Sequence, residues 1–349
     1  MIRYRGVIVL SILILSPLLA PVGVLRAQSH NMDIYFVDVE GGAATLVVTP
    51  AGESLLIDTG NPVADDRDAK RIYAATQQAG LKKIDYLLTT HYHGDHVGGA
   101  PALAKMIPIE KFLDHGQSVE TQNARGAQPW EAYLKIAEGR RTIVKPGDKI
   151  PLKGVDVLVV SSNGEVLAKP ITGGGPNPAC QGAQQKPPDQ TENQRSVGIL
   201  LTYGKFKFLD LGDLTWDKEM ELACPVNRLG TVNLYQVTHH GFFGGLSGAP
   251  AHVWAIKPQV AVVNNGPRKG LSPDSAYETL AKIPGIEGIW QAHLSLAVDK
   301  DHNTSEQMIA NLEDTGECKG NGIKASVAAN GDFTVTNERN GFSKLYRSR

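Results

Sequence analysis

The segment from residue 90 to residue 96, THYHGDH, holds the residue types best suited to chemistry in this chain. It ends a run of apolar residues at 84–90 that predicts a buried strand. Residues two apart in an extended chain point the same way, so His91 and His93 can contact one metal ion. A glycine then lets the chain turn, and Asp95 and His96 face a neighbouring position. Neutral imidazoles with a carboxylate suit zinc and would also accept iron or manganese.

Two further groups of potential ligands lie far along the chain. Asp213 follows a glycine after the strand predicted at 205–211, where it could bridge two metals or cap the helix predicted at 216–222. His239 and His240 stand together at the end of a strand predicted at 233–238. A buried pair of histidines without a metal or an acid would be costly. The three segments together therefore predict a two-metal site.

Strand-like and helix-like segments alternate along the chain, with no internal repeat and no linker that divides it. Strands that come first in pairs and later mix with helices indicate packed sheets with helices outside. Besides those already given, strands are predicted at 32–39, 45–49, 54–58, 110–113, 155–160, 197–203, 260–264 and 288–291, and helices at 66–79, 98–107, 249–256, 275–282 and 305–312.

Residues 169–195 are rich in Pro, Gly, Gln and Asn and have few large apolar side chains. They predict a long loop, and long loops in compact domains are often functional. Cys180 lies in this loop, and the other cysteines are Cys224 and Cys318. We favour a Cys180–Cys224 disulfide, because a crosslink there constrains a flexible segment, with three free thiols as the alternative.

The first 27 residues have the layout of a secretory signal peptide. Arg3 and Arg5 precede an apolar run at 7–20, and a small-residue cleavage site ends at Ala27. An uncleaved N-terminal anchor is the alternative. Cleavage leaves 28–349 as a single domain and removes three arginines and no acid, so the formal charge moves from −1 to −4. Such a protein has no general attraction for nucleic acid, and no later segment reads as a membrane span. We therefore expect a periplasmic or secreted protein.

The order of motifs resembles that of the metallo-β-lactamase superfamily, whose mark is His-x-His-x-Asp-His. The likeness is greatest to the lactamase-like domain of competence DNA-uptake channel proteins and to teichoic-acid phosphorylcholine esterases, and it covers residues 33–298. The motifs are FVDV at 36–39, LIDTG at 56–60, the histidine motif at 91–96, SVGIL at 196–200, GDL at 212–214, THHG at 238–241 and NNG at 264–266.

The resemblance implies an α/β protein, a four-layer αββα sandwich with metals between the sheets at one edge. The implied ligands are His91 and His93 on the first metal, Asp95, His96 and one of His239 or His240 on the second, and Asp213 shared by both. We prefer His239, because it lies directly at the predicted strand end. Asp58 would orient a ligand imidazole.

The ligand set departs from the family at one point. Many members have a further histidine ligand between the first motif and the bridging aspartate, and here the only histidine in that interval is His115. It could supply the ligand or line the site, and it could equally be a surface turn residue. Without it the first metal has fewer protein groups, which counts against β-lactam hydrolysis.

The substrate pocket also differs from that of competence-type domains. Ala43 stands where they carry an aspartate, and Phe242 and Phe243 replace a small hydroxyl residue. Each candidate for substrate contact could instead have a structural role, as a solvated loop charge or a packing residue. The candidates are Phe242, Phe243, Asn265, Arg268, Lys269 and His293.

The sequence thus predicts an exported metal-dependent hydrolase (EC 3) with two divalent metals, zinc first and manganese or iron as alternatives. Asp95 or Asp213 could accept the proton of the attacking water. We favour a small phosphodiester or phosphate ester as the substrate. A lactone or other carboxylic ester is the alternative, with a β-lactam behind it. A periplasmic metal-binding protein without activity is the third interpretation, and the oligomeric state is left open.

Overall fold

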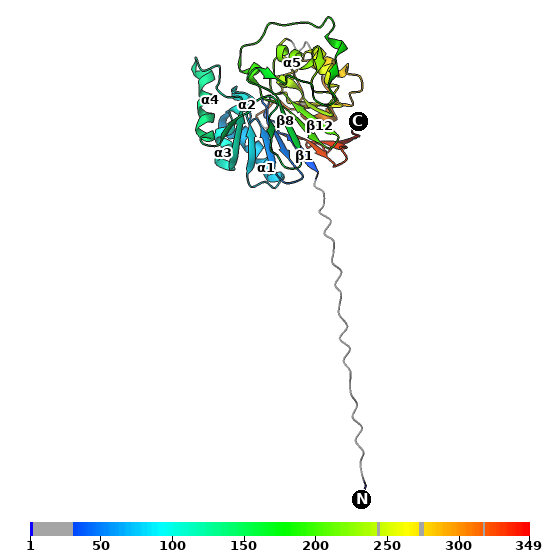
Figure 1. The fold of residues 1–349 in the computed structure, drawn as a ribbon. Coiled ribbons are helices and arrows are strands. Elements are labelled where there is room, and N and C mark those ends of the chain that lie inside the picture. Colours follow the sequence, from blue (N-terminus) through cyan, green and yellow to red (C-terminus); the bar gives the residue numbers. More distant parts are fainter. Residues whose placement is uncertain (3–30, 243–244, 272–275, 317) are drawn as a thin grey trace.

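The computed structural model describes residues 1–2, 31–242, 245–271, 276–316 and 318–349, and within these ranges two large sheets face each other (Figure 1). The signal peptide predicted at 1–27 lies outside the described residues, except for its first two residues. The substrate-contact candidate Phe243 also lies outside them. No helix in the described ranges is long and apolar enough to cross a membrane.

The first sheet combines N-terminal strands with the C-terminal end of the chain. Its order is β20-β19-β18-β1-β2-β3-β4-β5-β6. The strands are β1 Met32–Phe36, β2 Thr45–Val48, β3 Ser54–Ile57, β4 Ile84–Leu88, β5 Ile109–Asp114, β6 Arg141–Ile143, β18 Ile323–Val327, β19 Phe333–Asn337 and β20 Ser343–Tyr346. Strands β18 to β20 were not predicted, although β18 and β19 alternate buried and half-buried residues as strands on a sheet surface do.

The second sheet is built from the middle of the chain. Its order is β17-β16-β15-β14-β12-β11-β8-β7, with β9 paired to β8. The strands are β7 Lys149–Ile150, β8 Asp156–Ser162, β9 Glu165–Val166, β11 Gly198–Tyr203, β12 Phe206–Asp210, β14 Leu234–Gln236, β15 Val260–Val263, β16 Gly288–His293 and β17 Ile309–Asn311. Two short strands, β10 Gly175–Pro176 and β13 Val226–Asn227, pair with each other apart from it.

Helices cover the outer face of each sheet, which completes four layers. Apolar residues of α1 Arg67–Gln78, α3 Ala100–Met106 and α4 Ala124–Ala137 pack on the first sheet. Those of α5 Trp216–Ala223, α6 Pro250–Ile256 and α7 Ala276–Ala281 pack on the second. Figure 1 shows α1 and α3 on the blue and cyan side and α5 on the green side. The predicted αββα sandwich is confirmed.

The main core lies between the sheets, because successive side chains of a strand point to opposite faces. In β3, Leu55 and Ile57 join the core between the sheets, while Leu56 packs against the helices. In β12, Phe208 faces the other sheet and Leu209 faces the helices. Strands that are buried on both faces have continuous runs of apolar residues, and these runs make them recognisable in the sequence.

Some predicted elements differ from the structure. The helix predicted at 305–312 is instead a short 3-10 turn, Glu306–Met308, followed by β17. Its apolar residues Ile309 and Ala310 are buried at the sheet edge, and β17 pairs in parallel with β16. Tertiary pairing therefore overrides the local helical tendency. Helix α4 was not predicted, and it carries Pro129 inside its length.

Three strand ends bring the candidate ligands to one edge. β12 and β14 run parallel, so residues 213 and 239–240 follow strands that end at the same side of the second sheet. β4 supplies the histidine motif from the first sheet. A backbone hydrogen bond of 2.9 Å from Val197 N to Thr90 O ties the two sheets together at this point.

Candidate metal centre

The histidine motif changes from extended chain to helix at the place where its ligands diverge. His93 is extended, and the short helix α2 Gly94–Val97 begins immediately after it. His91 Nε2 and His93 Nδ1 consequently lie 3.1 Å apart, while Asp95 and His96 turn toward a different point. The backbone of Gly42 approaches closely here, since a Cβ on Gly42 would lie 2.4 Å from Asp95 O.

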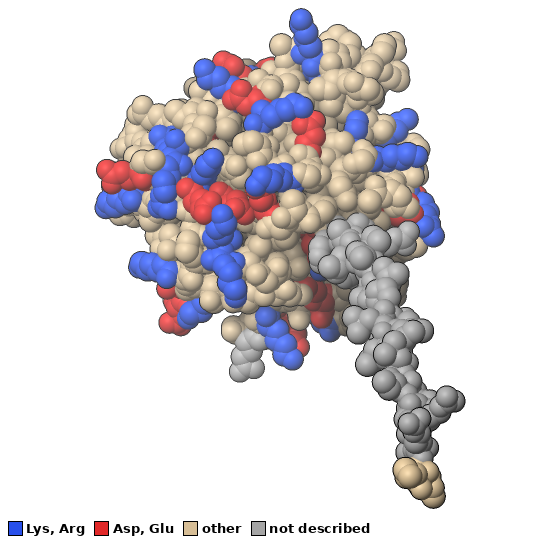
Figure 2. Space-filling model, turned by 60° about the horizontal axis from the view of Figure 1, so that its bottom comes forward, with Lys and Arg blue, Asp and Glu red and all other residues tan. Residues whose placement is uncertain are grey.

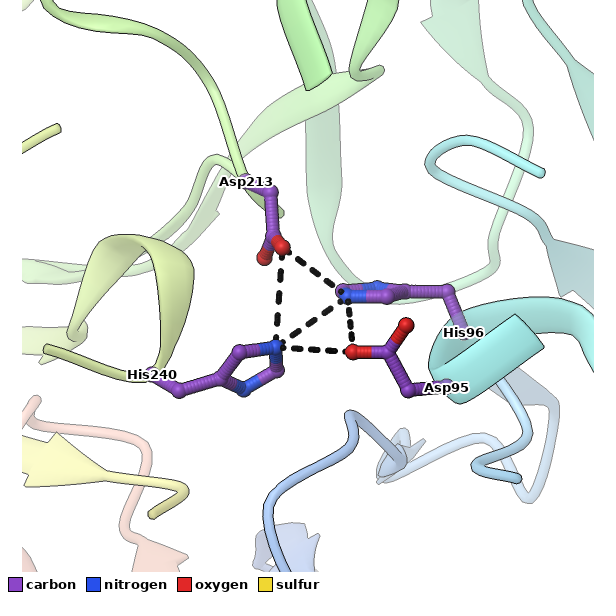
Figure 3. Close-up of side chains that lie close together, drawn as sticks. All are labelled: Asp95, His96, Asp213 and His240. Carbon is purple, nitrogen blue, oxygen red and sulfur yellow. Dashed lines mark hydrogen bonds and ion pairs between the residues drawn. The ribbon is translucent and has the colours of Figure 1, made fainter. Parts of the chain in front are cut away.

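Asp95, His96, Asp213 and His240 form the buried side of the centre. One nitrogen or oxygen atom of each faces the others, as Figure 3 shows. The distances are 3.2 Å for His96 Nε2 to Asp213 Oδ2, 3.3 Å for His96 Nε2 to His240 Nε2, 3.3 Å for His240 Nε2 to Asp95 Oδ2, 3.5 Å for His240 Nε2 to Asp213 Oδ2 and 3.6 Å for His96 Nε2 to Asp95 Oδ2. Segments far apart in the sequence thus converge.

His91 and His93 form the open side, next to the buried side. Asp213 Oδ2 lies 4.0 Å from His91 Nε2, so this carboxylate faces both sides. Gly212 sets its direction, with a φ of +56° that disfavours other residues. The side chain of His93 is 31% exposed, whereas that of His91 is fully buried. The open side therefore meets solvent through His93.

The histidine pair corrects one preference drawn from the sequence. Both His239 and His240 have positive φ, so the chain reverses within the turn 238–241. His240 Nε2 reaches the buried side, whereas His239 Nε2 lies 3.5 Å from Asp213 Oδ2 and its Nδ1 lies 3.1 Å from Ser247 Oγ. The geometry favours His240 over His239, because the tight turn directs the second ring inward.

The donor atoms fit a divalent cation. His96 Nδ1 donates to Asp58 Oδ2 at 2.6 Å, and its Nε2 faces the imidazole of His240 and two carboxylates. Burial alone would raise the pKa of Asp213, but the positive charge of the protonated His96, His239 and His240 rings outweighs it and holds that pKa well below its ordinary value. A divalent cation could replace these ring protons as the balancing positive charge, and the nitrogen and oxygen donors suit zinc, manganese or iron.

Comparison with known proteins agrees with this arrangement. Residues 37–186 match the family model of the metallo-beta-lactamase superfamily. This part of the chain is therefore similar to the metallo-beta-lactamase superfamily. A metal-dependent hydrolase of the UPF0173 group from Cupriavidus metallidurans is 46% identical over 74 residues, which is 20% of this chain and 23% of that protein.

Two other similar proteins have more specific names. ComE operon protein 3 of Bacillus subtilis is 22% identical over 253 residues, 68% of this chain and 29% of that protein. The atrochrysone carboxyl ACP thioesterase dmxR1 of a Cryptosporiopsis species is 37% identical over 67 residues, 19% of this chain and 20% of that protein. Each match thus covers less than a third of the relative. The resemblance predicted from the sequence is confirmed, and the prediction of a metal-dependent hydrolase agrees with these similarities.

Asp58 contacts the ligand that it was predicted to orient. Besides its bond to His96, it accepts hydrogen bonds from Thr90 N at 2.8 Å and from Thr90 Oγ1 at 2.7 Å. Burial raises the pKa of Asp58 above its ordinary value, although the His96 ring acts in the opposite direction. The fully buried carboxyl fixes the ring of His96 and the start of the histidine motif together.

Two buried acids near the centre were missed by sequence analysis. Asp210 Oδ1 accepts from Gly212 N at 2.9 Å, and burial raises its pKa to about 7. Glu219 Oε2 accepts from Ala249 N at 2.8 Å, and burial raises its pKa to about 8. Asp210 stands three residues before Asp213 at a strand end, which was a usable signal. Glu219 looks like any acid on a short helix, so only the fold reveals its burial.

His115 follows neither interpretation drawn from the sequence. It is only 1% exposed, so it is not a surface turn residue. Its side chain also contacts other residues than the candidate ligands. Its Nε2 pairs with Glu192 Oε2 at 2.9 Å, and its ring packs on that of Tyr92, with centroids 4.6 Å apart. Glu192 comes from the loop predicted at 169–195 and was not singled out. The open side therefore lacks a third histidine among the described residues.

A cleft of about 960 Å³ lies over the open side. His93 and Asp95 line it beside Lys269, whose Nζ reaches Asp95 Oδ2 in an ion pair. Lys105 and Arg125 also line it. Of the substrate candidates, Lys269 is thus placed in the cleft next to a ligand carboxylate.

The other substrate candidates are placed differently. Arg268 is 74% exposed and pairs with Asp314 at 2.6 Å, so it serves as a surface charge. Asn265 is buried and donates to His293 O at 2.8 Å, while His293 Nε2 contacts Asp38 Oδ1 at 2.7 Å. Asn265 and His293 therefore make buried contacts between distant segments of the chain. The ring of Phe242 lies 5.4 Å from that of His239, centroid to centroid, so it packs beside the turn 238–241.

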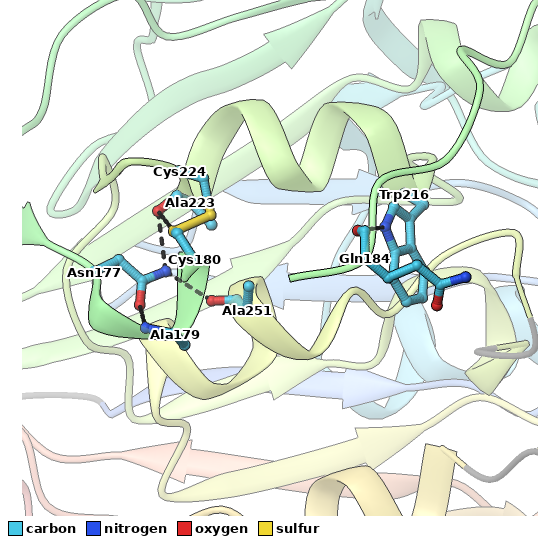
Figure 4. The surroundings of a disulfide bond; sticks show 8 residues. All are labelled: Asn177, Ala179, Cys180, Gln184, Trp216, Ala223, Cys224 and Ala251. Carbon is cyan, nitrogen blue, oxygen red and sulfur yellow. Dashed lines mark hydrogen bonds between the residues drawn. A yellow bond between two sulfur atoms is a disulfide. The ribbon is translucent and has the colours of Figure 1, made fainter. Parts of the chain in front are cut away.

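The Pro- and Gly-rich segment is anchored to helix α5. A Cys180–Cys224 disulfide joins them, which confirms the favoured pairing, and Cys318 is free. Figure 4 shows Asn177 beside it, donating to Ala223 O at 3.0 Å and to Ala251 O at 2.9 Å. Further along, Gln184 O accepts from Trp216 Nε1 at 3.1 Å. The segment is fixed at several points along its length.

Proposed function

We propose that the chain hydrolyses a small phosphodiester or phosphate ester with water activated between two divalent cations. The convergence of Asp95, His96, Asp213 and His240 within 3.2–3.6 Å, with His91 and His93 alongside, carries the proposal. Asp213 Oδ2 is the atom shared by the two sides. Two cations held there would bring the pKa of a shared water to about 7 and so supply hydroxide at neutral pH.

The residues of the chain divide the remaining tasks. Asp58 fixes the ring of His96, so that its Nε2 faces the centre. Asp95 and Asp213 are ionised carboxylates beside the position of the attacking water, so either can accept its proton. Lys269 lines the cleft and can hold an anionic oxygen of the substrate as charge develops there.

The charges of the cleft and of the surface favour a phosphoester of modest size. The cleft wall offers the cationic side chains of Lys105, Arg125 and Lys269. On the face drawn in Figure 2, basic and acidic side chains are interspersed, without the broad basic field that a long nucleic acid would need.

A carboxylic ester, thioester or lactone is the second candidate. The 37% identity to an ACP thioesterase over 67 residues favours this second candidate. Hydrolysis of a thioester, like that of a carboxylic ester or lactone, needs hydroxide and a stabilised oxyanion. We also propose that the protein is exported to the periplasm or beyond. The Cys180–Cys224 disulfide supports export, because such bonds persist in oxidising compartments.

Metal content and a substrate panel test the proposal. Purified protein is loaded with zinc or manganese, its metal is counted by elemental analysis, and bis-p-nitrophenyl phosphate is compared with p-nitrophenyl acetate, a thioester and a lactone. We expect two metals per chain and fastest turnover of the phosphodiester. Fastest turnover of the carboxylic esters would select the second candidate. Metal binding with no turnover of any of these substrates would instead identify a non-catalytic metal-binding protein.

A further inference from the structure

His93 is the most exposed of the ligand histidines, and its outer nitrogen contacts an acid. Its Nδ1 faces His91 Nε2 at 3.1 Å, which leaves Nε2 on the far side of the ring. That Nε2 lies 3.3 Å from Glu120 Oε2. A carboxylate at this position accepts a hydrogen bond from the Nε2–H group of His93. The proton of the ring therefore stays on Nε2, and the lone pair of Nδ1 faces the centre.

Glu120 is itself held in place. Its other oxygen, Oε1, accepts a hydrogen bond from the backbone N of Glu192 at 3.0 Å. Its own backbone N donates to Ser118 Oγ at 3.2 Å. Both carboxylate oxygens are therefore engaged, one by the ligand and one by the end of the segment 169–195.

Glu192 is a buried anchor for this arrangement. Its carboxylate accepts from Val119 N at 2.6 Å and from Tyr92 N at 3.3 Å, and it pairs with His115 Nε2 at 2.9 Å. It is 1% exposed. One side chain thus connects the loop before Glu120 with the histidine motif between His91 and His93. The same contact holds the only histidine between the motif and Asp213 in a pair with an acid.

We propose that Glu120 is a positioning residue for His93 and that Glu192 sets Glu120, so that the end of the Pro- and Gly-rich segment controls the open side. This inference rests on the proposed function, because it assigns one of the two cations to the open side, at His91 and His93. The buried side has its own support in Asp58. Apart from the shared Asp213, the two cations would consequently depend on different supporting carboxylates, Glu120 for the open side and Asp58 for the buried side.

Metal affinity measured separately from activity tests the inference. Full-length Glu120→Gln and Glu120→Ala proteins are titrated with zinc against a chelating dye, with Glu131→Gln as the control. Glu131 is an exposed acid on helix α4, and among the described residues its side chain has no hydrogen bond or ion pair. Loss of a partner that orients a metal-bound histidine typically costs 10- to 100-fold in affinity. We expect a loss of about that size for the weaker cation in both Glu120 variants, and unchanged affinity for the tighter one.

A Glu192→Gln variant tests the anchor, with thermal unfolding to check that it folds. We expect it to weaken the same cation, because Glu120 loses its fixed position. Wild-type affinity for both cations in Glu120→Gln and Glu120→Ala would overturn the inference. Failure of the proposed function would look different, since the wild-type protein itself would then turn over none of the ester substrates while the dye titration still ranks the variants.

Discussion

The two sides of the metal centre are built differently. The buried side draws its four donors from three distant segments, and a fully buried acid, Asp58, fixes His96 within it. The open side has two adjacent motif histidines, a cleft above it, and a half-exposed acid, Glu120, behind His93. Burial and ligand number both favour tighter binding at the buried side. If two cations bind as proposed, the difference predicts that their affinities are unequal and that the weaker one lies nearer the cleft.

Asp213→Ala should have the largest effect, because this carboxylate faces both sides. We expect both cations to bind weakly and turnover to fall about 1,000-fold, which corresponds to the several kcal/mol that a metal contributes to the transition state. Elemental analysis and phosphodiester hydrolysis would measure the two effects. Loss of only one cation would show that Asp213 belongs to a single side.

The next largest effect should come from His240→Ala, and the neighbouring His239→Ala should have a much smaller one. His240→Ala removes a donor of the buried side, so the tighter cation should lose more than the 10- to 100-fold typical of an outer partner. His239→Ala should leave the tighter cation within about tenfold of wild type, since its ring contacts only Asp213 on that side. Chelator competition on both variants measures this directly. The reverse order would restore the original preference for His239.

Asp58→Asn should have a smaller effect than Asp213→Ala or His240→Ala. The asparagine keeps an acceptor for His96 Nδ1 but loses the negative charge that strengthens the ring as a ligand. We expect the tighter cation to bind about 10- to 100-fold more weakly and the weaker one to be unaffected. Paired with Glu120→Gln, this forms a test in which each carboxylate weakens one cation. Equal losses of both cations in either variant would show that the sides are not independent.

Much of this protein could be predicted because its signals are local. The 91–96 motif brings four donors together within six residues, and continuous apolar runs mark the buried strands around it. The anchors could not be predicted in this way. Glu120 and Glu192 are 72 residues apart, and neither stands in a motif. Their roles depend on a contact between two loops that no periodicity encodes. His115 shows the same limit, because its partner lies 77 residues away.

The sequence by itself determined the donor types, because those follow from residue chemistry, and its resemblance to a known superfamily implied the layered fold. It favoured the Cys180–Cys224 pair but left three free thiols as the alternative. Only the tertiary structure decided which histidine of the 239–240 pair turns inward. It also decided which acids are buried beside the ligands and which side of the centre meets the cleft. The physical reason is that direction and burial arise when distant segments pack together, and the turn at 238–241 reverses the chain within four residues.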